Sequence, residues 1–252
     1  MNPNVLTLRP LGIVRCAAAT VADVPSEGLP STVVLEAEFA DALVGVEVGD
    51  YLHVITLFHL ADPAVLQGSP ATENTQGAFS IRSSCRPNLL GMTVARVTAI
   101  DGLNVSFDWL DFVDGTPVVD LKRYNWRWEC ILSARRLDRR FIERQIDRRA
   151  LVAVFERPAV NFHGESCSAT RRAAAWAAEL SQDHDIRVHD PAFRVHVRGD
   201  GHLIDAVQAL TAATFGNGRL DAVLDESAAE IVLTRCDETI KATWFADSWV
   251  LT

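Results

Sequence analysis

Two arginines lie four residues apart in the stretch GAFSIRSSCRPNLLGMTV, residues 77–94. Pro87 and the glycine four positions later predict a loop that would hold Arg82 and Arg86 in place. A rigidly placed guanidinium suits a carboxylate or a polar adenosine. Asn88 adds a compact amide that could hydrogen-bond a purine edge or stabilise the turn. This stretch could therefore bind a nucleoside ligand, or it could be an ordinary turn with surface ion pairs.

A second polar stretch, DFVDGTPVVDLKRY, occupies residues 111–124. Its Asp-Gly-Thr-Pro sequence at 114–117 predicts a turn that presents backbone groups and a hydroxyl. Asp120 and Lys122 lie two residues apart, so on a strand their side chains would share one face. Spacing alone leaves open whether this is a binding turn or an ordinary one.

Together the two stretches resemble the TsaA/TrmO-like family, whose pattern is close to G-V-F-A-T-R-S-x-x-R-P-N-P-I-G followed by D-G-T-P-V-x-D-I-K-P-Y. Residues 10–15 look like the family's opening strand, and residues 38–47 are similar to its E-Y-x-D-G-L-x-G-L-E segment. Phe58 and His59 look like the end of one of its strands, and the match spans about residues 8–125. The matching positions in the two stretches are Gly77, Phe79, Arg82, Ser83, Arg86, Pro87, Asn88, Gly91, Asp114, Gly115, Thr116, Pro117, Val118, Asp120, Lys122 and Tyr124.

The resemblance implies a small β-barrel that binds S-adenosylmethionine, in a homodimer with the site near the subunit interface. The family's known members methylate a threonylcarbamoyl-adenosine beside the tRNA anticodon, which makes tRNA a candidate substrate. The cofactor contacts that the resemblance implies are His59, Leu60, Arg82, Met92, Asp114, Gly115, Thr116 and Pro117, with Arg86 and Asn88 in support.

Methyl transfer from a sulfonium asks little of the protein, because the methyl carbon is already electrophilic. The protein must align a nucleophile with the S–C bond, and it must accept a proton if the nucleophile is an amide or amine nitrogen. The candidate bases are Asp114, Asp120 and His59, in that order. The alternative is that the two carboxylates only pair with nearby cations.

Three departures from the family pattern bear on the substrate. Residues 25–27 read Pro-Ser-Glu where the family often has P-R-Q, and this change should weaken contacts with phosphate. Leu89 and Arg123 each replace a proline. With a net charge of −9, these changes favour a small-molecule acceptor slightly over tRNA, and both are retained. Two further alternatives are an enzyme that transfers or cyclises the aminocarboxypropyl arm of the cofactor, and a non-catalytic binding module.

The second half resembles FmdE-like domains in two segments. Residues 160–167 look like the family's F-H-G-H-x-C, and residues 202–220 are similar to its C-x-x-D-A-I-Q-x-x-T-G-x-T-x-G-x-G-x-L. His163 and Cys167 are four residues apart, a spacing that can bring both to one metal on a helical turn. The resemblance implies His202 as a third ligand, for zinc or another borderline cation. The alternative is a decayed site that binds no metal.

The patterns between these motifs predict two kinds of structure. Short β-branched runs in the first half, with a hairpin turn at Asp101-Gly102, predict a mainly β barrel or sandwich over residues 1–131, and the family resemblance implies the barrel. An arginine-rich helix is expected as a linker at 132–152, with Ser133 as a candidate N-cap. Alternating helical and strand patterns predict an α+β domain at 153–252.

Composition is that of a globular protein, with 252 residues of which 48% are hydrophobic. The five cysteines, at an odd count, predict reduced thiols rather than a disulfide framework. We see no signal peptide and no run of about 18 apolar residues, so a cytoplasmic protein without a membrane span is expected.

Overall fold

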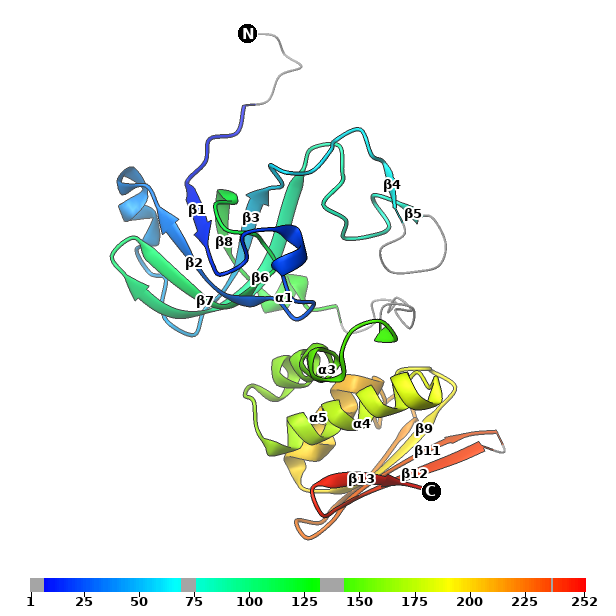
Figure 1. Cartoon of the computed structure of the whole chain (residues 1–252). Coiled ribbons are helices and arrows are strands. Elements are labelled where there is room, and N and C mark those ends of the chain that lie inside the picture. The colour runs from blue at the N-terminus through cyan, green and yellow to red at the C-terminus, as the bar shows by residue number, and fades with distance from the viewer. Residues whose placement is uncertain (1–6, 69–75, 132–142, 237) are drawn as a thin grey trace. The chain divides into compact units, whose positions relative to one another are not determined.

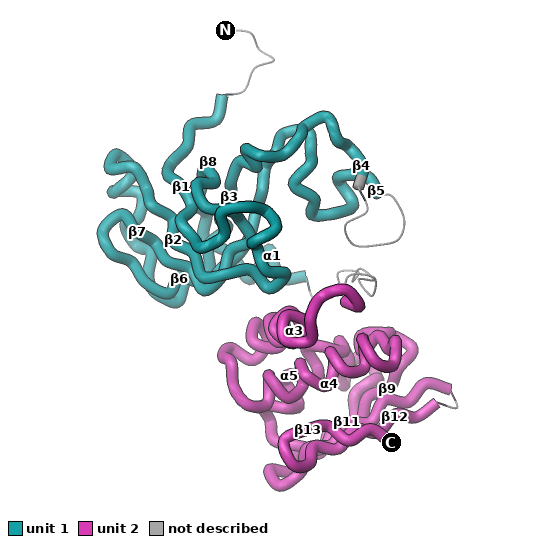
Figure 2. The backbone as a smooth tube through the Cα atoms, in the orientation of Figure 1, with its two compact units in different colours: residues 1–136 teal, residues 137–252 magenta. Residues whose placement is uncertain are grey.

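The computed structural model describes residues 7–68, 76–131, 143–236 and 238–252. The chain forms two compact units, residues 1–136 and residues 137–252 (Figure 2). Among the described residues, no helix combines the length and the apolar character needed to cross a membrane.

The first unit is a closed antiparallel barrel with the strand order β1-β2-β7-β6-β3-β8 (Figure 1). This confirms the predicted β-barrel. The strands are β1 (Gly12–Arg15), β2 (Leu29–Leu35), β3 (Tyr51–Leu57), β6 (Leu90–Asp101), β7 (Asn104–Leu110) and β8 (Pro117–Arg123). β6 and β7 meet at the predicted hairpin, where Gly102 has a φ of 57° and Asp101 pairs with Asn104.

Alternation along the strands fills the barrel. In β6 every second residue from Gly91 to Val97 is buried, because successive side chains of a strand point to opposite faces. The core consists of Val14, Val33, Leu35, Leu52, Val54, Ala95, Val97, Val105, Phe107, Leu110, Phe112 and Val118. Between β3 and β6 the chain leaves the barrel, forms the short strands β4 (Gln67–Gly68) and β5 (Gln76–Gly77), and returns as the arginine-bearing loop (Figure 1).

Short helices complete the first unit. The 3₁₀ helices η1 (Val21–Asp23) and η2 (Ala37–Leu43) connect barrel strands, and α1 (Trp126–Glu129) follows β8. α1 begins at Asn125, whose side chain accepts a hydrogen bond from the backbone N–H of Arg127, as N-cap residues do.

Within residues 143–236 and 238–252, the second unit is a five-stranded sheet with three helices. Its strand order is β10-β9-β11-β12-β13, in which only β9 and β10 run parallel. The strands are β9 (Arg194–Gly199), β10 (Leu220–Leu224), β11 (Ala229–Arg235), β12 (Glu238–Phe245) and β13 (Ser248–Leu251), and the helices are α3 (Arg148–His163), α4 (Ser168–His184) and α5 (Gly201–Thr211). The helices lie on one face of the sheet (Figure 1).

The helix predicted over residues 132–152 is described only in part. Residues 132–142, which include the candidate N-cap Ser133, lie outside the described residues. The described helix α3 begins after Asp147, whose side chain accepts hydrogen bonds from the N–H groups of Arg149 and Ala150. A carboxylate is a strong cap at this position, which explains why α3 starts there.

The helices of the second unit pack closely because α4 presents small side chains. Five alanines of α4 are buried, together with Trp176 and Leu180. Three of these alanines, with Trp176 and Leu180, join the buried faces of β9 and β11 in one apolar core. Two elements of this unit, β12 and β13, were not predicted from the sequence.

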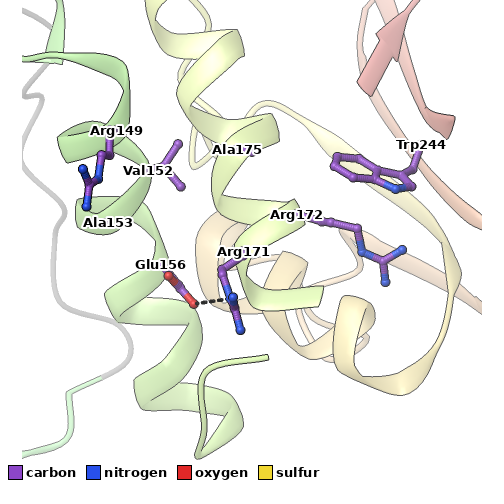
Figure 3. A pocket seen from close by; sticks show the side chains of 8 residues that line it. All are labelled: Arg149, Val152, Ala153, Glu156, Arg171, Arg172, Ala175 and Trp244. Carbon is purple, nitrogen blue, oxygen red and sulfur yellow. Dashed lines mark ion pairs between the residues drawn. The ribbon is translucent and has the colours of Figure 1, made fainter. Parts of the chain in front are cut away.

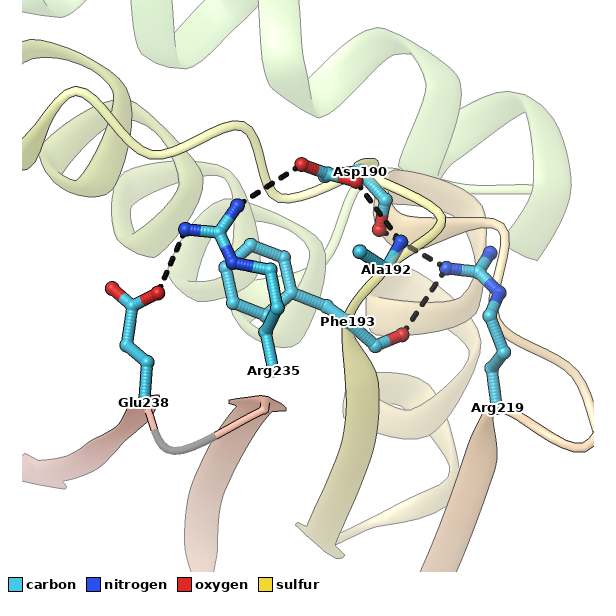
Figure 4. Close-up of polar contacts among 6 residues, drawn as sticks. All are labelled: Asp190, Ala192, Phe193, Arg219, Arg235 and Glu238. Carbon is cyan, nitrogen blue, oxygen red and sulfur yellow. Dashed lines mark hydrogen bonds and ion pairs between the residues drawn. The ribbon is translucent and has the colours of Figure 1, made fainter.

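Two arginines fasten the connection before β9 to the sheet (Figure 4). The Nη1 of Arg219 donates to the backbone oxygens of Asp190 and Phe193, each at 3.3 Å. Arg235 pairs with the carboxylates of Asp190 and Glu238 at 3.2 and 2.7 Å, and its guanidinium lies 4.7 Å from the centre of the Phe193 ring. These carboxylates raise the pKa of Arg235. The guanidinium therefore stays charged and holds the segment before β9 in place.

Candidate functional site

A pocket opens at the end of the barrel where β3 ends and β6 begins. Its volume is about 160 Å³. It is bounded by the end of β3, the arginine-bearing loop, the start of β6 and the segment after β7. Its lining residues are Phe58, Ile81, Arg82, Ser83, Arg86, Leu90, Gly91, Met92, Thr93, Asp111 and Phe112.

Arg86 organises the loop that forms one wall of this pocket. Its Nε donates to the carbonyl oxygen of Ser83 at 2.8 Å, and its Nη2 donates to those of Ile81 at 3.0 Å and Ala78 at 3.4 Å. A single partly buried guanidinium thus satisfies three loop carbonyls. These contacts account for much of the donor capacity of Arg86.

Arg82 joins the loop to β6. Its Nη2 donates to the carbonyl oxygen of Met92 at 2.5 Å, while the side chain remains exposed. A guanidinium has five N–H donors, so Arg82 keeps donors for a ligand. The structure therefore brings Arg82, Arg86 and Met92 together at one pocket, as three of the ten cofactor contacts that the resemblance implies.

The end of the loop depends on an unusual backbone. Leu89 has a φ of 52°, its N–H donates to the carbonyl oxygen of Arg86 at 3.1 Å, and its own carbonyl accepts from the N–H of Phe58 at 2.7 Å. Proline, the residue in the family pattern, is locked near −65° and has no N–H. In this conformation the position cannot be a proline, which is a physical reason for Leu89.

Asp111 brings a carboxylate to the pocket. Its Oδ1 accepts a hydrogen bond from the hydroxyl of Thr93, a residue that is 2% exposed. Asp111 itself is exposed. Neither residue was singled out from the sequence, although Asp111 is the first residue of the second polar stretch. Its distance of three positions from the Asp-Gly-Thr-Pro turn was the available signal.

The Asp-Gly-Thr-Pro turn closes the barrel. The Oδ1 of Asp114 accepts from the N–H of Cys16 and its Oδ2 from Arg15, both at 3.1 Å. Gly115 has a φ of 77°, and its N–H donates to the carbonyl of Val14 at 2.8 Å. Thr116, which precedes β8, is buried, and its hydroxyl donates to the carbonyl of Val113 at 2.8 Å. The turn thus fastens β1 to the start of β8.

The other predicted site residues of the barrel lie outside the pocket lining that the structure describes. His59 and Leu60 are exposed just after β3, and Asn88 is exposed on the loop. Asp120 is exposed on β8, where its Oδ1 accepts from the N–H of Leu121 at 2.9 Å. Asp114, Gly115, Thr116 and Pro117 form the closing turn and also lie outside this lining.

A buried histidine lies under α1. The Nε2 of His53 is 2.9 Å from the Oε2 of Glu129, and the same oxygen accepts from the N–H of Asn125 at 2.7 Å. These hydrogen bonds lower the pKa of Glu129. Burial raises the pKa of the neighbouring Tyr124. The pair attaches α1 to the outside of β3.

The second unit gathers the three predicted metal ligands. The Nε2 of His163 is 2.7 Å from the Nδ1 of His202, and one donor atom from each of His163, Cys167 and His202 lies within 4.8 Å of the others. The Nδ1 of His163 contacts the Oδ2 of Asp205 at 3.1 Å. Glu165, which is exposed, is outside this cluster of described residues.

Helix ends position this cluster. His163 is the last residue of α3, Cys167 is the N-cap of α4, and His202 lies in the first turn of α5. Two nitrogens and one sulfur form a donor set that suits zinc. Asp205 orients the ring of His163 in the way that carboxylates orient metal-ligating histidines.

Comparisons with known proteins match both halves of the chain to different extents. Residues 20–130 match the model of the tRNA-methyltransferase O N-terminal domain. An Archaeoglobus fulgidus protein named S-adenosyl-L-methionine-binding protein is 32% identical over 133 residues, which cover 50% of this chain and 94% of that protein. A second Archaeoglobus fulgidus protein, named probable S-adenosyl-L-methionine-binding protein, is 29% identical over 224 residues.

That second match covers 84% of this chain and 60% of the relative. The aligned segment of 224 residues is longer than either unit, so the match includes residues of both units. A mouse tRNA (adenine(37)-N6)-methyltransferase is 37% identical over 89 residues, which cover 33% of this chain but only 20% of the mouse protein. Among solved structures, one titled crystal structure of TrmO from Pseudomonas aeruginosa is 18% identical, with a TM-score of 0.45 and coverage of 98% of this chain and 96% of that one.

Proposed function

The chain belongs to the tRNA-methyltransferase O N-terminal domain family of S-adenosylmethionine-dependent methyltransferases, and we propose that it methylates the exocyclic nitrogen of a modified adenosine in tRNA. The observation that carries the proposal is the barrel pocket, which joins two arginines, a carboxylate and an apolar wall. The name of the mouse relative supports the choice of tRNA. A small-molecule acceptor that carries the same adenosine-like group is the alternative.

The pocket is suited to part of the cofactor. Phe58, Met92 and Phe112 offer apolar and aromatic surface to a nucleoside, and Arg82 offers donors to its carboxylate. Pockets for whole ligands of this size usually measure about 300–1,000 Å³, against about 160 Å³ here. We therefore infer that neighbouring segments and a second copy of the chain complete the site.

The exposed residues beside the pocket are candidates for that completion. His59 and Leu60 follow β3, and Asn88 lies on the arginine-bearing loop. Their exposure makes them accessible to a ligand that extends beyond the pocket. Such a site would agree with the homodimer that the family resemblance implies.

The bound cofactor would supply a methyl group on a positively charged sulfur. The chain would hold that group, exclude water with its apolar wall, and accept a proton as the N–CH₃ bond forms and the S–CH₃ bond breaks. We assign the proton to Asp111 in preference to Asp114, because Asp114 is held by Cys16 and Arg15. Thr93 orients one oxygen of Asp111, and the other has no partner among the described residues.

Mass spectrometry of the products tests the reaction. The protein is incubated with S-adenosylmethionine alone, with unmodified tRNA, and with tRNA that carries threonylcarbamoyl-adenosine. We expect S-adenosylhomocysteine and a methylated nucleoside only in the last mixture, and at least a 100-fold lower rate for Asp111→Asn. Methylthioadenosine would point instead to transfer or cyclisation of the aminocarboxypropyl arm. Cofactor binding without turnover on any acceptor would point to a binding module.

We also propose a zinc site at His163, Cys167 and His202, as the resemblance to FmdE-like domains implies. Its support is the donor cluster with Asp205 behind it. Three protein ligands leave a fourth position of a tetrahedral zinc site for water or a further group. Metal bound there would replace the contact between the two histidines and would hold the ends of three helices together.

Elemental analysis of the purified protein tests the metal site. We expect about one zinc per chain, lost in Cys167→Ala and retained in the control Cys236→Ala, since Cys236 is an exposed residue outside the cluster. Equal zinc content in the two variants would exclude this site.

A further inference from the structure

A groove on the second unit lies between α3, α4 and the end of β12 (Figure 3). Its volume is about 640 Å³. Neither the barrel site nor the histidine-cysteine cluster includes any of its lining residues. These residues are Arg149, Val152, Ala153, Glu156, Arg171, Arg172, Ala175 and Trp244.

The groove combines an apolar floor with exposed cations. Val152, Ala153 and Ala175 are partly buried and carry short side chains, so they leave room between the two helices. Arg149 on α3 and Arg171 on α4 are exposed. Cations from two facing helices over apolar surface form a surface that favours an anion with an attached apolar or aromatic group.

Arg171 keeps its terminal donors for an anion, although its Nε donates to the carbonyl oxygen of Cys167 at 3.3 Å and an acid lies nearby. Its Nε is 3.8 Å from the Oε1 of Glu156, and its side chain is 63% exposed. An exposed ion pair at that distance is weak. The same Glu156 oxygen already accepts hydrogen bonds from the hydroxyls of Ser166 at 2.6 Å and Thr170 at 3.1 Å. The acid is therefore engaged mainly with the start of α4.

Trp244 forms a fixed aromatic end to the groove. The guanidinium of Arg172 lies 5.8 Å from the centre of the Trp244 ring, and the ring of Trp249 meets it edge-on at 5.3 Å. The guanidinium of Arg172 pairs with the carboxylate of Asp200 at 3.2 Å. The backbone carbonyl of Arg172 accepts a hydrogen bond from the Nε1 of Trp249 at 2.7 Å. A partly exposed indole in a fixed position is a good stacking surface for a base.

We propose that this groove binds a nucleotide unit, with its phosphate at Arg149 and Arg171 and its base against Trp244 and the apolar floor. This inference rests on the proposed function, because it assigns the groove to a strand of the tRNA substrate. A free nucleotide has the same chemistry and is the other source of such a ligand.

The overall charge makes a local phosphate site necessary for RNA binding. The chain carries 24 basic and 33 acidic residues, and contacts with phosphate supply most of the affinity of proteins for nucleic acids. Residues 25–27 of the barrel, Pro-Ser-Glu, lack the cation of the family's P-R-Q. Arg149 and Arg171 would supply phosphate contacts from the second unit instead.

Binding measurements on the full chain test the groove. Fluorescence anisotropy with labelled tRNA is recorded at several salt concentrations for wild type and for the double variant Arg149→Gln with Arg171→Gln. We expect about tenfold weaker binding at low salt, and a slope of log K against log salt that is smaller by about 0.7–0.9 for each arginine removed. Trp244→Leu should weaken binding about fivefold or more without changing the salt slope.

The control variant is Arg194→Gln, which removes one positive charge from the same unit, against two in the double variant, so the salt slopes are compared per arginine removed. Arg194 is exposed at the start of β9, while the next residue, Val195, is buried in the core under the helices. Because neighbouring residues of a strand point to opposite faces, Arg194 lies on the other face of the sheet. Circular dichroism and thermal unfolding show whether each variant is folded.

Calorimetric measurement of AMP binding distinguishes the two sources of the ligand, a strand of tRNA and a free nucleotide. If the double variant loses AMP binding and tRNA binding together, the groove binds a nucleotide of RNA. If it loses AMP binding alone, the ligand is a free nucleotide. If wild type, the double variant and Arg194→Gln bind both ligands equally, the proposal is overturned. Loss of methyl transfer with intact tRNA binding would contradict only the proposed function, since binding here is measured without turnover.

Discussion

The barrel pocket and the histidine-cysteine cluster are built in opposite ways. In the barrel, two arginines donate to backbone carbonyls and thereby shape a loop, so the charged groups support the wall of the pocket. In the second unit, three helices place His163, Cys167 and His202 directly against one another. In this cluster the helix backbones position the side chains, whereas in the barrel the side chains position the backbone of a loop.

This difference has a consequence for ligand binding. A loop held by side-chain hydrogen bonds can adjust when a ligand competes for the same donors, so the barrel pocket depends on many individual contacts. The side chains at the helix ends that would bind a metal are held in place by the packing of the whole unit. We therefore expect point changes in the loop to affect binding more than stability, and changes behind the cluster to affect metal affinity alone.

The largest effect should follow removal of Arg86. Arg86→Ala leaves the carbonyls of Ser83, Ile81 and Ala78 without this donor, and hydrogen bonds to a charged group contribute about 1.5–3 kcal/mol each. We expect at least about 100-fold weaker binding of S-adenosylmethionine by calorimetry. Arg96→Ala, at an exposed position of β6, is the control. Similar affinities for the two variants would show that the loop does not need its internal guanidinium.

Gly91→Ala should be the next largest change. A Cβ at Gly91 would lie 2.6 Å from the Phe58 ring and 2.6 Å from the Thr56 hydroxyl oxygen. Overpacking of this kind costs about 1–3 kcal/mol, and displacement of Phe58 would narrow the pocket. Gly77→Ala, where a Cβ meets nothing within 4 Å, is the control. Chemical denaturation measures the stability of both variants, and we expect Gly91→Ala to be the less stable. Equal stability of the two variants would mean that β3 and β6 accommodate the added methyl group without cost.

Asp205→Asn tests the cluster from behind. Loss of such a partner typically weakens metal binding about 10–100-fold, and we expect the lower end because Asp205 is partly exposed. Zinc competition with a chelator measures the affinity. Asp221→Asn, which alters the partner of His196 at 2.9 Å, is a matched control outside the cluster. A change of zinc affinity in the control alone would contradict the assigned role of Asp205.

The smallest effect concerns acid stability. Ser227 and Arg198 lower the pKa of Asp225 to about 2. Because the folded-state pKa lies below the ordinary value of 3.8, the stabilisation is complete above about pH 4 and is lost as the pH falls towards 2. The difference in stability between wild type and Asp225→Asn should therefore shrink over that range. Asp247→Asn serves as the exposed control, and a difference that stays constant down to pH 2 would contradict the shift.

Much of the barrel was predictable because its signals are local. The hairpin at Asp101-Gly102 depends on a two-residue turn, and the polar stretches at 77–94 and 111–124 carry the family resemblance in order and spacing. The spacing of His163 and Cys167 likewise follows from neighbouring positions.

The positions of side chains from distant segments could not be predicted in this way. Asp111 meets Thr93 only because β6 and the end of β7 lie side by side. The Asp114 turn was expected at the cofactor, but its carboxylate is engaged with β1, since closing a barrel requires a contact between the first and last strands. The groove residues Arg149, Arg171 and Trp244 are far apart in the sequence, and no spacing rule connects them.

The sequence by itself determined that a β-rich half of this chain carries the pattern of an S-adenosylmethionine-binding family, and that a His-x-x-x-Cys pair follows it. Local residue order is sufficient for such statements, because turns, strand alternation and helical spacing are set within a few residues. Only the tertiary structure decided which polar groups face the pocket and which fasten strands. That choice depends on the pairing of strands and the packing of helices from distant parts of the chain, which bring together groups with no local relation.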